Sequence, residues 1–445
     1  MKKFEITGNR MAGKLARVAV CTVLAASMLT GCAGRGEASM EQVQAQENGQ
    51  TVNSEANATE TVSPAEITRA TSDFDKSLIE FLNEKGFSEE NYMVSPTSFR
   101  AALALAIAGA DTETRQELIN AMGFSSMEEV NAWYASVEEM ISDFNSGIKE
   151  DQENFKETIA KYAPELTPPD GSLVMLNSIW NNTDLNGKFA RDYIKYVQKY
   201  YGAEAHDVNS KNITGKVNGF VNKGTNGLIP TISNDLSNAN AVLVNTLYLK
   251  SGWINSFNDY LTAKGSFTTI KGEKVEKEFM EQQEKFRFYE DEDGKLIVLP
   301  LNGGMYAVFT LGEVKEISAA LKKATFEDVI VKLPKFEVES SFSENEFIDF
   351  LQNRGAKLAF TQDADFSVMC KDTNWMISDI IQKTRIKVDE DGLEAAAATA
   401  IMMTEGCLAV EPEQPKEFIA DEPFRFYICG GDDLSEVLFY GQVVE

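Results

Sequence analysis

The spacing of hydrophobic residues predicts helices in the first part of the chain. Apolar residues recur at helical intervals behind a polar cap at Thr71-Ser72, and Gly86 ends this first helix. A second helix begins at Ser95-Pro96, and because it is apolar on nearly every side we expect it to be buried. Helical patterns continue to about residue 145. The charged stretch 149–170 then predicts an excursion from the domain surface.

Strand patterns dominate the rest of the chain. Short apolar or alternating runs predict six strands, at residues 173–180, 241–249, 296–299, 305–311, 329–338 and 436–444. Helices followed by well-separated strands favour a mixed α+β domain over a doubly wound parallel fold.

A stretch with little side-chain bulk follows a strand-like segment near the C-terminus. Residues 385–388 alternate with period two, Gly392 permits a chain reversal, and residues 393–400 read Leu-Glu-Ala-Ala-Ala-Ala-Thr-Ala. Alanine favours helices, so a short surface helix is one interpretation. The other is a loop that can slide between two existing strands, because small side chains displace no packed neighbours.

The N-terminus has the pattern of an export signal. Basic residues precede an apolar run at residues 18–29, which is too short to span a bilayer. The run ends in Leu29-Thr30-Gly31-Cys32, which resembles the lipobox of bacterial lipoproteins. That resemblance implies removal of residues 1–31 and lipid modification of Cys32. Residues 32–67 are too polar to build a core and predict a flexible tether with a reach of about 35 Å.

Composition narrows the function classes. The 445 residues include 42 Lys and Arg against 69 Asp and Glu, which gives a formal charge of -27. Nothing in so acidic a chain concentrates the cations that replace phosphate counterions, so nucleic acid is not an expected partner. The single histidine, His206, leaves Ser-His, Cys-His and multi-histidine metal sites without partners. We therefore expect no enzyme activity, metal or cofactor, and a packing or surface role for His206.

The cysteines do not indicate a disulfide framework. Cys21 would leave with the signal, and the remaining cysteines are widely spaced. We expect Cys370 and Cys429 to be buried as small hydrophobic residues. Cys407 falls in the expected exposed loop, where a thiol can be oxidised.

Motifs in a fixed order along the chain resemble the serpin family of serine protease inhibitors, as a bacterial lipoprotein member. They run from about residue 68 to the C-terminus. The motifs are Asn91 through Ser98, Gly227-Leu228-Ile229-Pro230, Val244 through Trp253 with Phe257 and Thr262, Leu333-Pro334-Lys335-Phe336, Ala364-Asp365-Phe366-Ser367, the alanine-rich stretch, and Glu422-Pro423-Phe424 leading to Leu438-Phe439-Tyr440-Gly441.

This resemblance implies an α+β serpin fold, a cluster of helices packed on three β-sheets with an exposed reactive-centre loop. It places the hinge of that loop at Glu390, Gly392, Leu393, Glu394, Ala395, Ala396, Ala397, Ala398 and Thr399. Beneath the main sheet it places Ser95, Ser98, Asn245 and Gln382 in the shutter, and it places Trp253 in the breach, where the loop first enters.

The mechanism that the resemblance implies is suicide inhibition. A protease attacks the exposed loop, and before the acyl-enzyme hydrolyses, the residues from Leu393 to about Met403 insert into the main sheet as a new strand. The family's usual hinge length puts the scissile bond near Gly406-Cys407, although this loop is longer than usual. Residues 393–415 contain no Lys or Arg, which disfavours trypsin-like targets. Elastase-like, subtilisin-like or papain-like proteases fit better, and Glu405 leaves room for a glutamate-selective one.

Two departures from the family pattern keep other functions open. Gln382 stands where many serpins have a histidine, and Leu393 stands where the first inserting residue is often Thr or Ser. A leucine there could slow insertion. The leading prediction is a monomeric protease inhibitor, exported and lipid-anchored on the outer side of a bacterial membrane. The alternatives are a non-inhibitory serpin that acts as a binding or adhesion module and a lipoprotein that presents a ligand site on this scaffold.

Overall fold

The computed structural model describes residues 63–162, 168–342, 345–371, 375–393, 414–430 and 435–445. These ranges fall within one compact unit, Thr61–Glu445. The predictions for Cys32, for hinge residues 394–399, and for Gly406, Cys407 and the rest of the loop lie outside the described residues.

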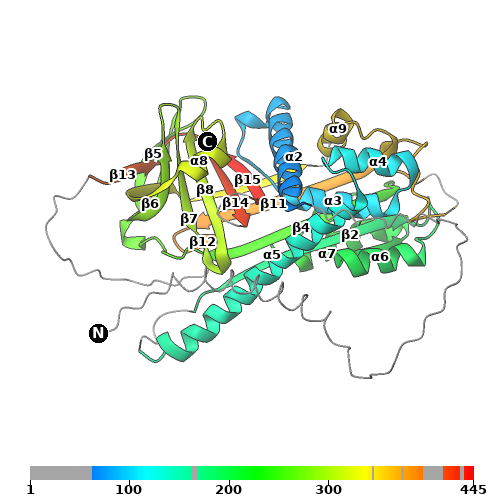
Figure 1. The fold of residues 1–445 in the computed structure, drawn as a ribbon, viewed down its shortest axis with the longest axis horizontal. Coiled ribbons are helices and arrows are strands. Elements are labelled where there is room, and N and C mark those ends of the chain that lie inside the picture. Colours follow the sequence, from blue (N-terminus) through cyan, green and yellow to red (C-terminus); the bar gives the residue numbers. More distant parts are fainter. Residues whose placement is uncertain (1–62, 163–167, 343–344, 372–374, 394–413, 431–434) are drawn as a thin grey trace, which may run out of the picture. The chain divides into compact units, whose positions relative to one another are not determined.

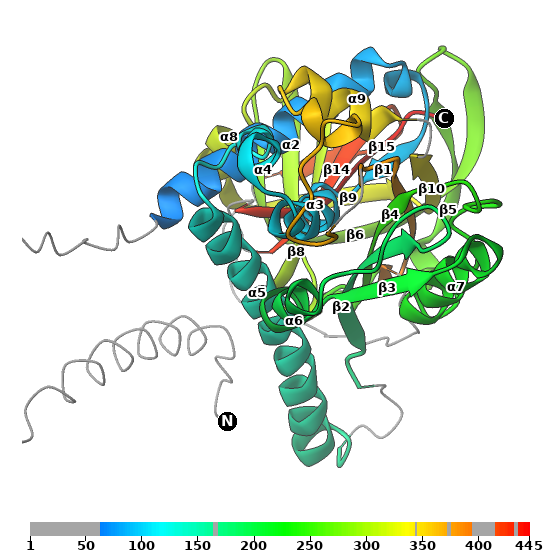
Figure 2. The same ribbon diagram turned by 90° about the vertical axis from the view of Figure 1, so that its right-hand side faces the viewer.

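The helices gather mainly on one part of the molecule, where α2, α3, α4 and α9 pack together (Figures 1 and 2). None of the described helices is long and apolar enough to cross a membrane. Their bounds are α2 Pro64–Glu84, α3 Pro96–Gly109, α4 Thr112–Ala121, α5 Met127–Asn154, α6 Arg191–Tyr201, α7 Ser210–Gly224, α8 Ile317–Lys323 and α9 Glu346–Asn353.

The two N-terminal helices differ in how well the sequence predicted them. The prediction that α3 is buried is confirmed, because all of its residues are buried and the Ser98 amide donates to Ser95 Oγ at 3.2 Å. Helix α2 begins at Pro64, seven residues before the predicted cap at Thr71, so that start was wrong. Proline suits the first helical position because its missing N–H is not needed there.

Helix α5 is longer than predicted and projects past the strands (Figure 1). It continues to Asn154 and into a π-helical turn, Phe155–Ile159, so the helix end predicted near residue 145 was wrong. The reason is that the buried Ile148 and Phe155 extend the apolar face into the charged stretch.

The strands form two hydrogen-bonded sheets. The six-stranded sheet has the order β10 (Phe336–Phe342), β11 (Asp379–Asp389), β12 (Gly392–Leu393), β4 (Ala241–Gly252), β2 (Gly171–Asn182) and β3 (Glu204–Val208). The nine-stranded sheet runs β1 (Tyr92–Val94), β15 (Glu436–Val443), β14 (Phe424–Gly430), β8 (Met305–Gly312), β7 (Gly294–Pro300), β6 (Lys274–Glu290), β9 (Thr325–Pro334) and β13 (Lys416–Ile419), with β5 (Ala263–Thr268) also paired to β6.

The long strand β6 explains why two sheets are seen and not three. It pairs with β5 near its start, with β9 along its middle and with β7 at its end, so hydrogen bonds make this sheet continuous. The single strand predicted at 329–338 is in fact β9 and β10, which belong to different sheets. Pro334 has no N–H for a ladder bond, and Lys335 separates the two strands.

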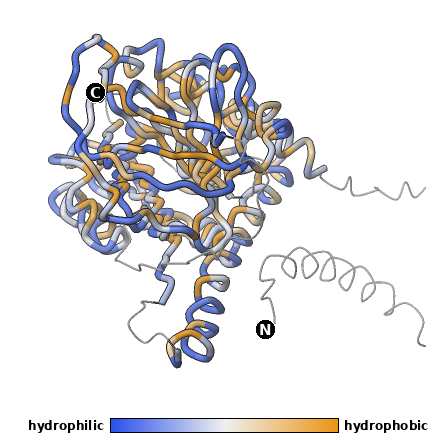
Figure 3. Tube along the Cα trace, turned by 90° about the vertical axis from the view of Figure 1, so that its left-hand side faces the viewer, coloured by the Kyte–Doolittle hydropathy of each residue, from blue (hydrophilic) through white to orange (hydrophobic). Residues whose placement is uncertain are grey.

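Hydrophobic residues are concentrated between these layers (Figure 3). Helix α3 lies between β4 of the six-stranded sheet and β15 of the nine-stranded sheet, and the largest hydrophobic cluster surrounds it. A second cluster fills the space between the two sheets, and a third lies between the six-stranded sheet and α7. The six-stranded sheet is therefore covered on both faces.

Candidate functional site

The site predicted from the hinge lies in the six-stranded sheet, where β11 and β4 are only partly joined. The two strands run parallel and pair directly at one end, through Asp379–Ile381 with Val242–Val244. At the other end, β12 fits between them and pairs antiparallel with both: Leu393 lies opposite Val388 of β11 and Ser251 of β4. Within the described chain, no backbone pairing joins the two strands between these points.

A hollow occupies this unpaired interval. The hollow is narrow: the volume open to the centre of a water molecule is about 10 Å³, the space of roughly one water. Leucine side chains of β4, Ile386 of β11 and Leu393 itself line it, together with the chain that follows α7 at Leu228-Ile229. Leu393 is 1% exposed, so the first hinge residue is already seated in the sheet. The structure therefore shows Gly392 and Leu393 as a short strand seated at the mouth of the hollow.

Backbone contacts at the breach hold the turn that precedes β12. The Trp253 indole donates to the carbonyl of Asp389 at 2.9 Å, and the Trp253 amide donates to the carbonyl of Asp391 at 3.0 Å. The Phe257 amide donates to the carbonyl of Glu390 at 2.9 Å. Trp253 is 3% exposed. This segment after β4 thus fixes the direction in which the hinge enters the sheet.

The Glu390 carboxylate adds a second hold on the same turn. It accepts a hydrogen bond from Thr262 Oγ1 at 2.7 Å and pairs with Lys335 Nζ at 3.0 Å. Burial raises the pKa of Glu390, but the bonds from Thr262 and Lys335 outweigh it and hold the pKa below its usual range. The bond to Glu390 likewise raises the pKa of Lys335. Lys335 comes from the break between β9 and β10, so this pair ties the hinge to both sheets.

Gln382 connects β11 to the start of α3, below the hollow. Its side-chain oxygen accepts from the Ser95 amide at 2.8 Å, and its amide nitrogen donates to the Ser95 carbonyl at 2.9 Å. Ser95 Oγ donates to the carbonyl of Leu438 at 2.6 Å. Two residues along β11, Thr384 Oγ1 donates to the carbonyl of Met93 at 2.7 Å. One neutral side chain therefore satisfies both backbone groups of a helix cap.

Asn245 connects β4 to the same turn of α3. Ser98 Oγ donates to the Asn245 side-chain oxygen, and the Asn245 amide donates to Asn177 of β2. The chain of bonds continues from Asn177 to the Tyr134 hydroxyl of α5, which donates to the carbonyl of Tyr201 at 2.8 Å. Both strands that flank the hollow are thus bound to one helical turn through different side chains.

The structure brings together the residues that the sequence singled out. Ser95, Ser98, Asn245 and Gln382 are in mutual contact through the α3 turn, Trp253 lies against the hinge, and Gly392 and Leu393 form β12. Lys335 belongs to one of the recognised motifs but had no predicted role. Asn177 was not predicted to be a site residue. Nothing in the sequence pairs Lys335 with Glu390, because 55 positions separate them.

Other expectations concern residues away from the hollow. His206 stacks on Trp180 with ring centroids 4.1 Å apart, which confirms a packing role. Cys370 and Cys429 are buried, as predicted. Across the described ranges, no group of three or more His, Cys, Asp or Glu residues is arranged to hold a metal ion.

The fold and the hollow together define a class of protein whose sheet can accept one more strand from its own chain. A family model described as serpin (serine protease inhibitor) matches residues 69–445. The chain therefore belongs to the serpin family. Serpins are in general protease inhibitors and not enzymes, so membership supports inhibition of proteases by the serpin mechanism.

Proteins of similar sequence occur in distantly related organisms. The chain is 28% identical to leukocyte elastase inhibitor A of Mus musculus over 408 residues, which covers 85% of this chain and 99% of the relative. It is 28% identical to an uncharacterised serpin-like protein of Thermococcus kodakarensis over 378 residues, covering 80% of this chain and 81% of that protein.

Solved structures agree with this fold. Serpin48 from the insect Tenebrio molitor superposes with a TM-score of 0.66 at 27% identity, covering 86% of this chain and 99% of that structure. The native state of the thermophilic serpin tengpin superposes with a TM-score of 0.69 at 24% identity, covering 87% and 95%. The predicted serpin fold is thereby confirmed.

Proposed function

We propose that this protein is a monomeric inhibitor of serine and, in some cases, cysteine endopeptidases, and that it traps them by inserting its cleaved loop between β11 and β4. The single observation that carries the proposal is β12, which already pairs with both strands at the mouth of the hollow. A strand continuing from Leu393 has unpaired backbone on either side of it. Added residues gain backbone hydrogen bonds to the two neighbouring strands in alternation.

The register of β12 gives the length of chain that the hollow accepts. Leu393 lies opposite Ser251 and Val388, so continued antiparallel pairing brings residues 394–399 opposite the unpaired stretches 245–250 and 382–387. These six residues are the small-residue part of the predicted hinge. Insertion beyond Thr399 requires the direct pairing of β11 with β4 to part.

The same register gives complementary neighbours to the inserting side chains. Glu394 comes opposite Lys250 and Lys387, so an acidic group meets two ammonium groups. Alternation places Ala395, Ala397 and Thr399 on the face of Leu393, toward the core between the sheets. Thr399 would then lie opposite Asn245 and Gln382, where a hydroxyl can exchange hydrogen bonds with either amide.

Leu393 supports this proposal, although its bulk first favoured the alternatives. The concern was that a leucine slows the first step of insertion. In the structure that step precedes cleavage, because Leu393 is already packed with Ile386, Val388 and Leu249. On the core face, the remaining insertion involves two alanines and a threonine, which leave few packed atoms to displace.

The target is proposed to be elastase-like, subtilisin-like or papain-like. The absence of Lys and Arg from residues 393–415 supports this choice. The leukocyte elastase inhibitor among the relatives is consistent with it. The scissile bond is proposed near Gly406-Cys407. Mass spectrometry of the C-terminal fragment from a trapped complex should find a new N-terminus between residues 402 and 411, and efficient trapping of trypsin would contradict the assignment.

The decisive experiment mixes the purified domain with a protease panel and looks for complexes that survive boiling in detergent. Ala397→Arg should abolish the complex while leaving the loop a good substrate, because its register buries the new charge opposite Leu247 and Thr384. Gln414→Arg is the matched control, since it places the same charge at an exposed position beyond both the inserting segment and the expected cleavage window. The insertion proposal is wrong if Ala397→Arg traps protease with unchanged stoichiometry.

The second candidate is a non-inhibitory binding or adhesion module. The observation that favours it is the same seated Leu393, since a hinge packed at 1% exposure can also be a fixed part of the fold. The protease panel decides between the two functions: cleavage of the loop without any stable complex, for every protease tested, supports the binding module.

We further propose that the protein is exported and held at the outer side of a bacterial membrane by lipid on Cys32. The supporting observation is the sequence Leu29-Thr30-Gly31-Cys32 after an apolar run. A lipid of this kind tethers a protein to the surface without spanning the membrane. Cys32→Ala should abolish lipid labelling and release the protein from the membrane fraction, whereas Cys407→Ala should change neither.

A further inference from the structure

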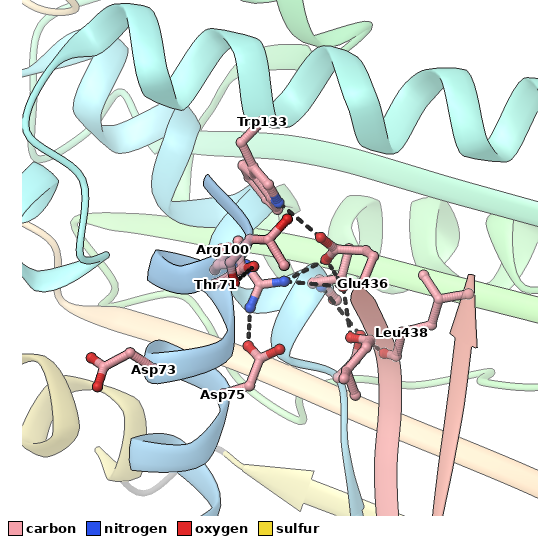
Figure 4. Close-up of polar contacts among 12 residues, drawn as sticks. Thr71, Asp73, Asp75, Arg100, Trp133, Glu436 and Leu438 are labelled. Carbon is pink, nitrogen blue, oxygen red and sulfur yellow. Dashed lines mark hydrogen bonds and ion pairs between the residues drawn. The ribbon is translucent and has the colours of Figure 1, made fainter. Parts of the chain in front are cut away.

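Arg100 is a fully buried cation in α3, the helix that binds both strands flanking the hollow (Figure 4). Its Nη1 pairs with Asp75 of α2, and its Nη2 pairs with Glu436 at the start of β15. The rings of Trp133 and Phe74 lie 5.1 and 5.7 Å from its guanidinium carbon. The other oxygen of Glu436 accepts a hydrogen bond from the Trp133 indole at 3.1 Å. Asp75, Arg100, Trp133 and Glu436 form what we call the Arg100 cluster.

The Arg100 cluster is one end of a longer row of polar contacts between α3 and β15. Three side chains of α3 and its cap contact three consecutive residues of the strand. Ser95 Oγ donates to the Leu438 carbonyl at 2.6 Å, and Thr97 Oγ1 donates to the Val437 carbonyl at 2.7 Å. Arg100 completes the series through the carboxylate of Glu436. The start of β15 is therefore fastened along the whole first part of the helix.

Stability alone does not account for charges in this position. Removing three ionised groups from water costs several kcal/mol each, and apolar side chains of similar volume often stabilise a core as well or better. The rest of α3 is almost entirely apolar, so such side chains would suit the site. An ion pair adds a defined geometry, because a guanidinium group donates hydrogen bonds to carboxylates only in fixed directions.

That geometry matters for the hollow because the first turn of α3 is bound to both strands that flank it, β11 and β4. Ser95 binds β11 through Gln382, and Ser98 binds β4 through Asn245. A turn that could tilt would follow either strand as the two separate. A turn that is fixed on β15 cannot follow either strand. Gln382 and Asn245 must therefore break their bonds to this turn before β11 and β4 can move apart.

We propose that the Arg100 cluster is a positioning device that fixes the first turn of α3 on β15 and thereby sets the barrier to separating β11 from β4. The inference rests on the proposed function, since separation of these strands is the step that loop insertion requires. Arg100 makes no contact with the inserting chain in this scheme and acts through Ser95 and Ser98.

The test measures strand separation directly, without a protease. The probe is a fluorescent synthetic peptide with the sequence of residues 393–404, which competes for the hollow. The variant Asp75→Asn/Arg100→Met/Glu436→Gln removes all three charges, nearly keeps their volumes and leaves an acceptor for Trp133. It should keep the thermal midpoint of the wild type and take up the peptide about tenfold faster, which equals about 1.4 kcal/mol of barrier. It should also yield fewer trapped complexes per loop cleaved.

Leu321→Ala in α8 is the matched control, because it creates a cavity under the other sheet. It should lower the midpoint and leave peptide uptake unchanged. Glu436→Gln alone is a conservative change that should not impair folding, and it should give an intermediate rate of peptide uptake. Rates for both cluster variants within about twofold of the wild type overturn the positioning role. A wild type that takes up peptide and traps protease then keeps its proposed function, whereas a wild type that does neither overturns both.

Discussion

At the scale of single residues, Gln382 shows how one neutral side chain can replace a titratable one. Its oxygen and nitrogen satisfy the amide and the carbonyl of Ser95 at once, and it is 4% exposed. A histidine in this position would change its donors with pH, and this glutamine does not. We therefore expect the hold of α3 on β11 to be insensitive to pH near neutrality.

The corresponding prediction concerns Gln382→Ala. It leaves the buried Ser95 amide without its partner, while the Ser95 carbonyl keeps the bond from the Phe99 amide, so unfolding should become easier by about 1–3 kcal/mol and peptide uptake should accelerate. Gln442→Ala is the control, since Gln442 is also 4% exposed and donates to backbone carbonyls, but of the segment before β1. Urea unfolding and peptide uptake check both. Equal acceleration in the two variants would show that Gln382 has no special place at the hollow.

The ion pair of Glu390 with Lys335 gives a second prediction, on pH. The lowered pKa of Glu390 means that its stabilisation is present above the unfolded value of about 4.3 and is lost as pH falls through the folded value. The raised pKa of Lys335 means that its part is lost only as pH rises beyond about 10.4. The stability difference between wild type and Glu390→Gln should be constant from about pH 5.5 to 9.5 and shrink in acid.

Glu276→Gln provides the baseline for that series, because its pair with Lys264 is exposed and should contribute little at any pH. Urea midpoints of the three proteins across pH give the two differences. A difference for Glu390→Gln that persists unchanged below pH 4 would mean that hydrogen bonding to Thr262, and not charge, holds the hinge.

The residue scale also shows what the sequence could reveal and did not. Arg100 is a lone charge in a helix whose other core residues are apolar, and that contrast was a readable signal. Its partners could not be read in the same way. Asp75 and Glu436 are two among 69 acidic residues, and only the packing of α2 and β15 on α3 selects them.

At the scale of elements, periodicity predicted several buried strands but missed the charged strand β6 and the largely buried strand β14. The apolar runs of β2, β4, β7, β8 and β15 were found because these strands are buried on both faces. Strand β6 was missed because its sequence, Lys-Val-Glu-Lys-Glu-Phe-Met-Glu-Gln-Gln-Glu, is charged and suits a helix. Pairing with β5 and β9 overrides that preference, and no local pattern reports such pairing.

Element β12 carries its own prediction through Gly392. Its φ is +144°, and an added Cβ would meet the Ser251 carbonyl and come within 2.6 Å of Gly252 Cα. Gly392→Ala should therefore expel β12 from between β4 and β11. Hydrogen exchange at Ser251 and Gly252 should increase, and cleavage after Leu393 should become faster. Gly86→Ala is the control, because Gly86 also has a positive φ, +104°, but its Cβ would meet nothing within 4 Å.

An unchanged exchange pattern in β4 of Gly392→Ala would show that β12 tolerates the new methyl group and that the hinge does not depend on this glycine. If Gly86→Ala exposed β4 to the same extent, the effect would reflect general destabilisation and not the hinge.

At the scale of the whole molecule, the order of short motifs predicted the fold better than any one element did. Gly227 through Pro230 and Leu333 through Phe336 were recognised although the strand at 329–338 was misread as continuous. The relation between the hinge and the sheet was beyond the sequence. Whether Leu393 lies outside the sheet or within it depends on the distance between β4 and β11. The sequences of these two strands are compatible with either arrangement.

The partly open sheet leads to the prediction that cleavage of the loop stabilises the protein. Once the loop is cut between Met403 and Ala409, residues 394–399 are free to continue β12. Successive residues then gain backbone hydrogen bonds to β4 and β11 in alternation, worth about 0.5–1.5 kcal/mol per bond, against about 1–2 kcal/mol per residue for ordering the chain. Burial of the alanine face and closure of the hollow add to the gain.

We expect the thermal midpoint to rise by roughly 5 °C after cleavage, since the net gain is several kcal/mol and a domain of this size shifts by little more than about 1 °C per kcal/mol. Calorimetry before and after nicking by an elastase-like protease measures it. The nicked Ala397→Arg variant should gain much less, because its register buries a charge in the core between the sheets. A wild-type midpoint that stays the same after cleavage would mean that the hollow is a static feature, and the protein would then be a binding module built on the serpin fold.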